Sequence, residues 1–304
     1  MTRGQTGAEG RRLSDDPTSA FCRDRVTYER CYELCKFACL VQSNDPELRR
    51  LVELLLGPFA ASKSAGSSGR TYLISRTGPE RVSLQADGEV VLSDVLAFEV
   101  FHFLLWDVSQ RAISSENEHL ALHAGCVVRG GRGLVLPAPS GSGKSTLTAG
   151  LVAAGCDYLS DEVALLDLST GMLRPFPRPL GMSQRAIGFL PGLEGRLPPE
   201  LTIGDRPEGH VPPAAIRPNP LGGPCELAYV IVPEHVPGGP TRLEPIRRSE
   251  AVLAMVGNAF NFGRFKGAGL VALGPILQGV RPYRLRMGDL EEAVALVMSA
   301  MVLP

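Results

Sequence analysis

Three features are missing from this 304-residue chain, and each absence excludes a class of protein. No stretch approaches about 18 uninterrupted apolar residues, so we expect no transmembrane span and no membrane partner. The charges almost cancel, with 31 basic and 32 acidic residues, so no general field directs the protein to nucleic acid. The N-terminus lacks the apolar run of a secretory signal, and its Gly/Ser/Arg/Asp-rich composition predicts a disordered leader over residues 1–26.

The cysteines form neither an even set nor a C-x-x-C pair. They stand at positions 22, 31, 35, 39, 126, 156 and 225. The four-residue spacing of Cys31, Cys35 and Cys39 allows a metal triplet, but the segment is apolar and has no histidine nearby. We therefore expect these cysteines to pack as small hydrophobic side chains in a strand. An odd number of cysteines in a chain of this length favours a reducing, cytoplasmic location.

A glycine-rich segment is the most informative feature that the chain does contain. Residues 138–146 read Ala-Pro-Ser-Gly-Ser-Gly-Lys-Ser-Thr, with an apolar run before them and a helix-like run, 147–154, after them. This strand–loop–helix setting is typical of a phosphate-binding loop (Walker A), although Ala138 stands where the usual pattern has its first glycine. Glycines at 141 and 143 let backbone N–H groups surround an anion, and the following helix presents its positive end to it. The alternative is a plain Gly/Ser loop with a solvated lysine.

From this loop we expect a nucleotide-binding site. Lys144 would reach the β- and γ-phosphates of ATP, and the hydroxyl of Ser145 would ligate Mg²⁺. The expected nucleotide-binding residues are Ser140, Gly141, Ser142, Gly143, Lys144, Ser145 and Thr146.

The residues on either side of the loop predict an α/β protein in two parts. A small α/β N-terminal domain, 27–116, is expected to hold a strand over 31–42, a helix from Asp45-Pro46 to Leu56, a flexible loop over 63–69, short strands at 72–75, 82–85 and 90–92, and a long helix from Ser93 to Ile113. His102 lies within that apolar helix, and we expect a packed or surface histidine there rather than a ligand.

The second domain, 117–304, is expected to contain the loop. Strands 120–128 and 133–136 form a hairpin around Gly130-Gly131 and lead into the loop and the helix 144–154. Further strands are expected at 163–168, 173–176, 227–232, 242–246 and 283–286, and helices at 249–259, 270–278 and 289–301. The Pro- and Gly-rich stretch 175–224 predicts an irregular or mobile lobe near the site.

An acidic pair and a histidine flank the loop at informative distances. Asp161-Glu162 follows Lys144 by 17 residues, and His123 precedes it by 21. The pair is also compatible with a Walker B arrangement, in which Asp161 holds magnesium and Glu162 polarises water. His123, with apolar neighbours on both sides, is alternatively a packed strand histidine.

The order and spacing of the histidine, the loop and the acidic pair in segment 119–168 resemble those of the HPr kinase/phosphorylase family and of ATP-type phosphoenolpyruvate carboxykinase. The segment is most similar to the HPr kinase-related group. The resemblance implies a P-loop core of mixed sheet with helices. It also implies that Asp161 is the general base on a substrate hydroxyl, assisted by His123. Glu162 and Ser145 would hold Mg²⁺.

The same resemblance implies a function. Lys144, with the amides of Gly141, Gly143 and Thr146, would stabilise the transferring phosphoryl group, and phosphoryl transfer itself needs mainly positioning and charge neutralisation. We therefore expect an ATP- and Mg²⁺-dependent kinase acting on a Ser or Thr hydroxyl of a small protein or peptide. HPr kinases are hexamers, so a homo-oligomer is compatible with the resemblance. The alternatives are a P-loop NTPase whose hydrolysis drives a conformational change, and a nucleotide sensor without catalysis.

Arg178 and the segment 258–266 each allow two interpretations. Arg178 lies between two prolines. One interpretation is that it binds a phosphate or an acidic substrate, and the other is that it is an ordinary surface arginine. Residues 258–266 mix aromatic and basic side chains that would touch adenine or a peptide, although core packing at a helix end is the favoured interpretation.

Overall fold

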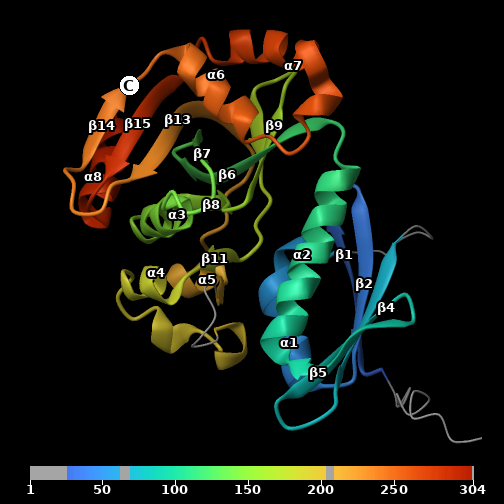
Figure 1. Cartoon of the computed structure of the whole chain (residues 1–304). Coiled ribbons are helices and arrows are strands. Elements are labelled where there is room, and N and C mark those ends of the chain that lie inside the picture. Colours follow the sequence, from blue (N-terminus) through green and yellow to red (C-terminus); the bar gives the residue numbers. More distant parts are fainter. Residues whose placement is uncertain (1–25, 62–68, 203–208, 303–304) are drawn as a thin grey trace, which may run out of the picture.

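The computed structural model describes residues 26–61, 69–202 and 209–302. Almost all of the expected leader, 1–26, and most of the expected loop 63–69 lie outside the described residues, as does Cys22. The described chain is a mixed α/β structure in which two large sheets are each covered by helices (Figure 1). No described helix is both long and apolar enough to cross a membrane.

The N-terminal sheet has five strands in sequence order, β1 to β5. Only the pair β2–β3 is parallel. Alternate residues of β1 to β4 are buried, so one face of the sheet is apolar, and α1 and α2 cover that face. The elements are β1 (Tyr28–Leu34), β2 (Phe37–Ser43), α1 (Pro46–Leu56), β3 (Arg70–Arg76), β4 (Arg81–Ala86), β5 (Glu89–Leu96) and α2 (Ala97–Ser115), with a short 3₁₀ turn at Gly57–Phe59.

Two expectations for this part were wrong. The expected strand 31–42 is a hairpin of β1 and β2, because the chain turns at Cys35, whose φ of 53° is left-handed. Cys35 thus lies in a turn, whereas Cys39 is buried in the core. The helix expected from Ser93 begins at Ala97, because residues up to Leu96 still pair with β4 and the carboxylate of Glu99 accepts a hydrogen bond from the Leu96 amide.

The second sheet is mixed, and the strand that leads into the glycine loop, β7, lies in its interior. Its strands run in the order β10-β9-β6-β7-β13-β15-β14, with β8 beside β6 and β10 also paired to β13. The pairs β7–β13 and β13–β15 are parallel, and the other pairs are antiparallel. The strands are β6 (His119–Arg129), β7 (Arg132–Pro137), β8 (Asp157–Ser160), β9 (Val163–Asp167), β10 (Met172–Arg174), β13 (Cys225–His235), β14 (Arg242–Pro245) and β15 (Arg281–Met287). The expected hairpin is confirmed in β6 and β7, which turn at two glycines with positive φ, Gly130 and Gly131.

Helices cover both faces of this sheet. Leu134 and Leu136 of β7 belong to a core shared with α3 and α8, whereas Val135, on the opposite face, belongs to a core shared with α6 and α7. The helices are α3 (Lys144–Ala153), α6 (Arg248–Gly257), α7 (Phe262–Ile276) and α8 (Leu290–Ala300). The helix expected at 270–278 starts earlier, because the chain is already helical from Phe262 and only kinks at Lys266.

The Pro- and Gly-rich stretch 175–224 is irregular, as expected, and contains only short elements. A two-stranded sheet joins β11 to β12, and brief helical turns pack around it. These elements are β11 (Leu180–Met182), α4 (Gln184–Gly188), 3₁₀ turns at Glu194–Arg196 and Pro199–Leu201, β12 (Gly209–Val211) and α5 (Pro213–Ile216). Leu180, Met182 and Val211 belong to the core that also contains α3, which fixes the lobe beside the loop.

Candidate functional site

The glycine loop lies between β7 and α3. Strand β7 lies inside the sheet, between β6 and β13, and ends at Pro137, and α3 begins at Lys144. Gly141 and Gly143 have φ values of +83° and +84°, a backbone conformation that side chains disfavour. A Cβ atom on Gly143 would also lie 2.3 Å from the Cε atom of Met287. Glycine is therefore required where the loop enters the helix.

A second glycine brings α3 close to β6. A Cβ atom on Gly125 would lie 2.3 Å from Thr148 Oγ1 and 3.3 Å from Lys144 Cγ, so only glycine permits this approach. The result is that Lys144, on the first turn of α3, lies beside His123 of β6, with 3.1 Å between Nζ and Nε2. Lys144 is only 5% exposed.

Asp161 lies just after β8 and is 2% exposed. Its Oδ2 atom accepts a hydrogen bond from the Gly181 amide (3.2 Å), while its Oδ1 atom is buried without a partner in the described part of the chain. Burial raises the pKa of Asp161 to about 6. The charge of Lys144 opposes that rise, the charge of Glu162 adds to it, and the nearby Ser145 hydroxyl lowers the pKa. Asp161 therefore has one oxygen available to a ligand and a pKa close to neutrality.

Glu162 and His123 line the same cavity as Lys144 and Asp161. Glu162 Oε1 lies 3.5 Å from His123 Nε2, and the Glu162 side chain is 38% exposed. Burial is the main cause that lowers the pKa of His123, and the charges of Lys144 and Arg178 lower it further against the opposing charge of Glu162. A neutral His123 with an unprotonated Nε2 accepts a hydrogen bond from the Lys144 ammonium.

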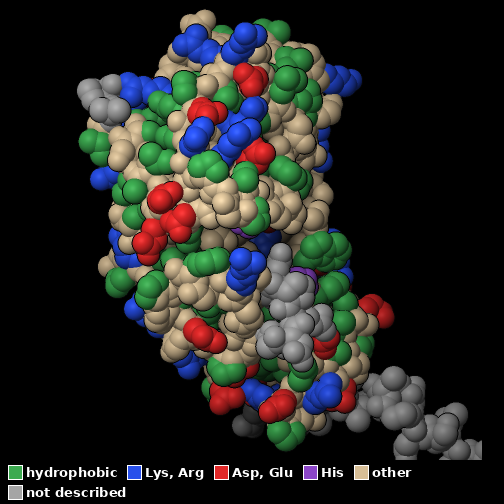
Figure 2. Space-filling view, turned by 60° about the vertical axis from the view of Figure 1, so that its left-hand side comes forward, with side chains coloured by type: hydrophobic (Ala, Val, Ile, Leu, Met, Phe, Trp, Pro, Cys, Tyr) green, Lys and Arg blue, Asp and Glu red, His purple; other side chains and the backbone are tan. Residues whose placement is uncertain are grey.

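These side chains line one cavity of about 640 Å³. The lining includes every site residue expected from the sequence except Ser142: His123, Ser140, Gly141, Gly143, Lys144, Ser145, Thr146, Asp161, Glu162 and Arg178. The hydroxyl of Ser142 is buried without a partner among the described residues. Figure 2 shows histidine side chains in a hollow near the middle of the face it presents.

The sequence interpretation missed several residues of this cavity. His210 and Arg185 come from the irregular lobe, His235 and Met287 from the ends of β13 and β15, and His102 from α2. His102 had been expected to be only a packed or surface residue, but it lines the cavity and its ring stacks on His210. No local pattern marks these positions, because the cavity joins segments that are distant along the chain.

The 258–264 segment holds the strand that carries His123. The Asn258 carbonyl accepts a hydrogen bond from the His123 amide (2.6 Å), and Asn261 Oδ1 accepts one from the Ala121 amide (2.9 Å). The Phe260 ring lies 5.6 Å from the ring of His123. The favoured packing interpretation of this segment thus agrees with its contacts, which fix β6 next to the cavity.

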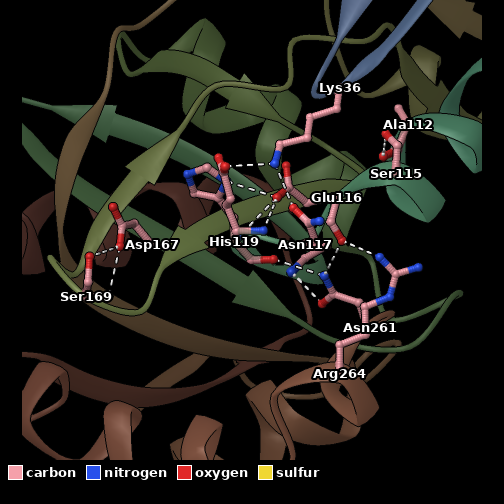
Figure 3. Close-up of polar contacts among 12 residues, drawn as sticks. Lys36, Ala112, Ser115, Glu116, Asn117, His119, Asp167, Ser169, Asn261 and Arg264 are labelled. Carbon is pink, nitrogen blue, oxygen red and sulfur yellow. Dashed lines mark hydrogen bonds and ion pairs between the residues drawn. The ribbon is translucent and has the colours of Figure 1, made fainter. Parts of the chain in front are cut away.

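The same segment ties down the junction between the two sheets (Figure 3). Arg264 donates to the backbone carbonyls of Ser114 and Glu116, both at 2.7 Å, and Asn261 Nδ2 donates to the His119 carbonyl at 2.9 Å. The Glu116 carboxylate accepts hydrogen bonds from the amides of Glu118 and His119. The start of β6 is therefore held from both sides.

Comparison with known proteins gives little beyond this geometry. No family model matches the chain, and no curated protein matches it. Among solved structures, the HPr(Ser) kinase/phosphatase from Coxiella burnetii is similar over 60% of this chain and 96% of its own, with 13% sequence identity and a TM-score of 0.28. At that identity and TM-score, function has to be argued from the residues of the site.

Proposed function

We propose that this protein is an ATP- and Mg²⁺-dependent kinase that transfers the γ-phosphoryl group to a hydroxyl, a serine or threonine of a small protein or peptide. One observation carries the proposal. The buried carboxylate of Asp161, whose Oδ1 atom has no partner among the described residues, lines the same cavity as Lys144 at the start of α3. A cation at a helix N-terminus suits a polyphosphate, and a carboxylate beside it suits a hydroxyl that must lose its proton.

The residues present fit a nucleotide and a magnesium ion. The positive φ values of Gly141 and Gly143 suit a loop whose amides turn toward an anion, and Lys144 has a histidine ring, not a carboxylate, as its hydrogen-bonded partner. Ser145 and Glu162 supply the oxygen ligands that magnesium prefers, and the ion would neutralise the charge of the phosphates. Lys144, Ser145, Thr146 and the loop amides would hold the phosphates.

Asp161 is suited to take the proton of the acceptor hydroxyl. A general base works best when its pKa lies near the operating pH, and the pKa of Asp161 is raised to about 6 by burial. His123 Nε2 accepts a hydrogen bond from Lys144, so His123 would position the ammonium group at the start of α3.

A second assignment is favoured by one contact. The Ser145 hydroxyl lowers the pKa of Asp161, and a serine close to this aspartate is the arrangement expected when the two residues together hold magnesium. Glu162 would then polarise water, and the protein would hydrolyse ATP. The two assignments differ in where the γ-phosphoryl group goes.

The test is a transfer assay with γ-labelled ATP, magnesium and a lysate of the source organism, comparing wild type with Asp161→Asn. We expect a labelled acceptor with wild type, and at least about a hundredfold slower labelling with Asp161→Asn at unchanged nucleotide affinity. Release of labelled phosphate without a labelled acceptor would favour the hydrolase. Nucleotide binding with neither product, in wild type and variant alike, would indicate a sensor and contradict the proposal.

A further inference from the structure

His210 is buried in the cavity wall and has no hydrogen-bonded partner among the described residues. Its exposure is 3%, and neither Nδ1 nor Nε2 has a partner in the part of the chain that the structure describes. Because a buried polar group without a partner is costly, and nearly all such groups in folded proteins are satisfied, the imidazole requires an explanation. Its place in the lining of the cavity makes a bound ligand the simplest one.

Two aromatic rings from α2 fix the orientation of His210. The ring centroids of Phe98 and His102 each lie 5.3 Å from that of His210, at interplanar angles of 16° and 29°. Burial, together with the charge of Arg178 and the ring of His102, lowers the pKa of His210 to about 3. The ring is therefore neutral at pH 7 and presents one N–H donor and one acceptor.

Arg178 supplies a cation next to this ring. Its Nε atom is buried without a partner, and no ion pair of Arg178 is found among residues 26–61, 69–202 and 209–302. Its backbone is fixed, because Tyr158 Oη donates to the Arg178 carbonyl (2.6 Å) and the Arg178 amide donates to the Phe176 carbonyl (2.8 Å). Arg178 lines the same cavity as His210, His123 and Asp161, and its charge lowers the pKa of each of these three groups.

A short piece of sheet connects His210 to Asp161. Gly181 of β11 is the cross-strand partner of His210 in β12. The amide of the same Gly181 donates to Asp161 Oδ2. His210 and the buried carboxylate are thus neighbours of one residue, and Arg178, His210 and Asp161 all line the same cavity.

We propose that Arg178 and His210 bind an anionic group, a carboxylate or a phosphate, on the same acceptor whose hydroxyl faces Asp161. The inference rests on the proposed function for the role of Asp161 and narrows it, because it requires an acceptor that carries both a hydroxyl and an anion. Guanidinium and imidazole N–H groups are the donors that such an anion prefers, and no carboxylate of the described residues forms an ion pair with Arg178.

The test uses inorganic phosphate and acetate as probes, with the full chain and an excess of magnesium and a non-hydrolysable ATP analogue. The ring-nitrogen NMR signals of His210 are identified by their loss in His210→Phe, which keeps an aromatic ring in the stack. We expect at least one of the two anions to shift the His210 signals saturably, and the responding anion identifies the class. Arg178→Gln should weaken this binding by roughly tenfold or more, whereas Arg174→Gln, an exposed arginine of β10, should leave it unchanged.

Two results would overturn the inference. One is that neither anion shifts the His210 signals in wild type, and the other is that Arg178→Gln binds the responding anion as well as wild type does. Nucleotide affinity is measured by calorimetry on the same proteins before the analogue is added, and unchanged signals of His119, whose ring contacts Glu116 outside the cavity lining, show that Arg178→Gln is folded. If the wild type does not bind the nucleotide, the proposed function is contradicted. The result of the anion titration is then judged separately.

Discussion

Three deeply buried titratable side chains line the cavity. Lys144, Asp161 and His210 are each at least 95% buried, and they come from three different elements or their ends. Charged and polar groups are seldom buried without a partner unless they serve a site, because desolvation is costly. Burial is the main cause of the perturbed pKa values of Asp161, His123 and His210, and the charge of Arg178 adds to the lowering at the two histidines; such clusters are typical of functional sites.

His210 predicts a pH-dependent loss of stability. Its pKa is about 3 in the folded protein and near the ordinary 6.5 in the unfolded chain. Above pH 6.5 the ring is neutral in both states and has no effect on stability. As the pH falls from 6.5 toward 3, only the unfolded chain gains a proton, so stability falls by up to about 1.4 kcal/mol per pH unit from this residue.

The measurement is the free energy of unfolding by denaturant at several pH values, for wild type and His210→Phe. The difference between the two proteins isolates the contribution of His210, since other groups cancel. We expect the wild type to lose stability more steeply than the variant below pH 6.5. Parallel curves would show that folding does not lower the pKa of His210.

At the scale of elements, the sequence predicted what local signals encode. Two adjacent glycines, Gly130 and Gly131, identify the β6–β7 hairpin, and Asp45, followed by Pro46, marks the start of α1, where its carboxylate accepts from the amides of Glu47 and Leu48. The β1–β2 turn was missed because no glycine, proline or asparagine marks Cys35. The start of α2 was missed because pairing of β5 with β4 overrides the capping preference of Ser93.

The close contact of α3 with β6 gives a prediction for Gly125→Ala. The added methyl group would meet Thr148 Oγ1 at 2.3 Å, so α3 must move away from β6. We expect a loss of about 1–3 kcal/mol in the free energy of unfolding, measured by chemical denaturation. The matched control is Gly263→Ala, where nothing lies within 4 Å of the new atom and φ is not positive, and it should change stability by less than about 0.5 kcal/mol. Equal stability of the two variants would contradict the packing described here.

At the scale of the whole molecule, the two sheets share apolar contacts. Phe176, which follows β10, lies with its ring 5.3 Å from that of Phe59 in the N-terminal part. Ala121, Val163 and Leu165 belong to the same buried cluster as the residues of α1 and α2. The domain boundary between 116 and 117 stays a prediction, because the sequence marks it only by a polar cluster and the two parts meet through a common core.

This shared core predicts cooperative unfolding. We expect one transition in scanning calorimetry, with equal calorimetric and van't Hoff enthalpies, because neither sheet can unfold without exposing apolar surface of the other. Two resolved transitions would contradict this expectation and favour independent domains.

The candidate site shows the same division between local and long-range information. Residue types and spacing predicted the loop, Asp161, Glu162 and His123 as site residues. In the structure they line one cavity. His102 and His210 were not predicted, because their contact depends on how α2 packs against β12. The spacing of residues along the sequence predicts which side chains one strand–loop–helix unit brings together. The rest of the cavity wall depends on tertiary packing.

The central claim is that the glycine loop and Lys144 bind the phosphates of a nucleotide. Calorimetric titration of the protein with magnesium and a non-hydrolysable ATP analogue tests it most directly, for wild type, Lys144→Met and the control Lys36→Met, whose lysine contacts Asn117 and Glu118. The account predicts saturable binding to wild type and Lys36→Met, and binding weakened by roughly tenfold or more in Lys144→Met, because a charge-assisted hydrogen bond is lost. No heat of binding in wild type, or equal affinity in all three proteins, would contradict it.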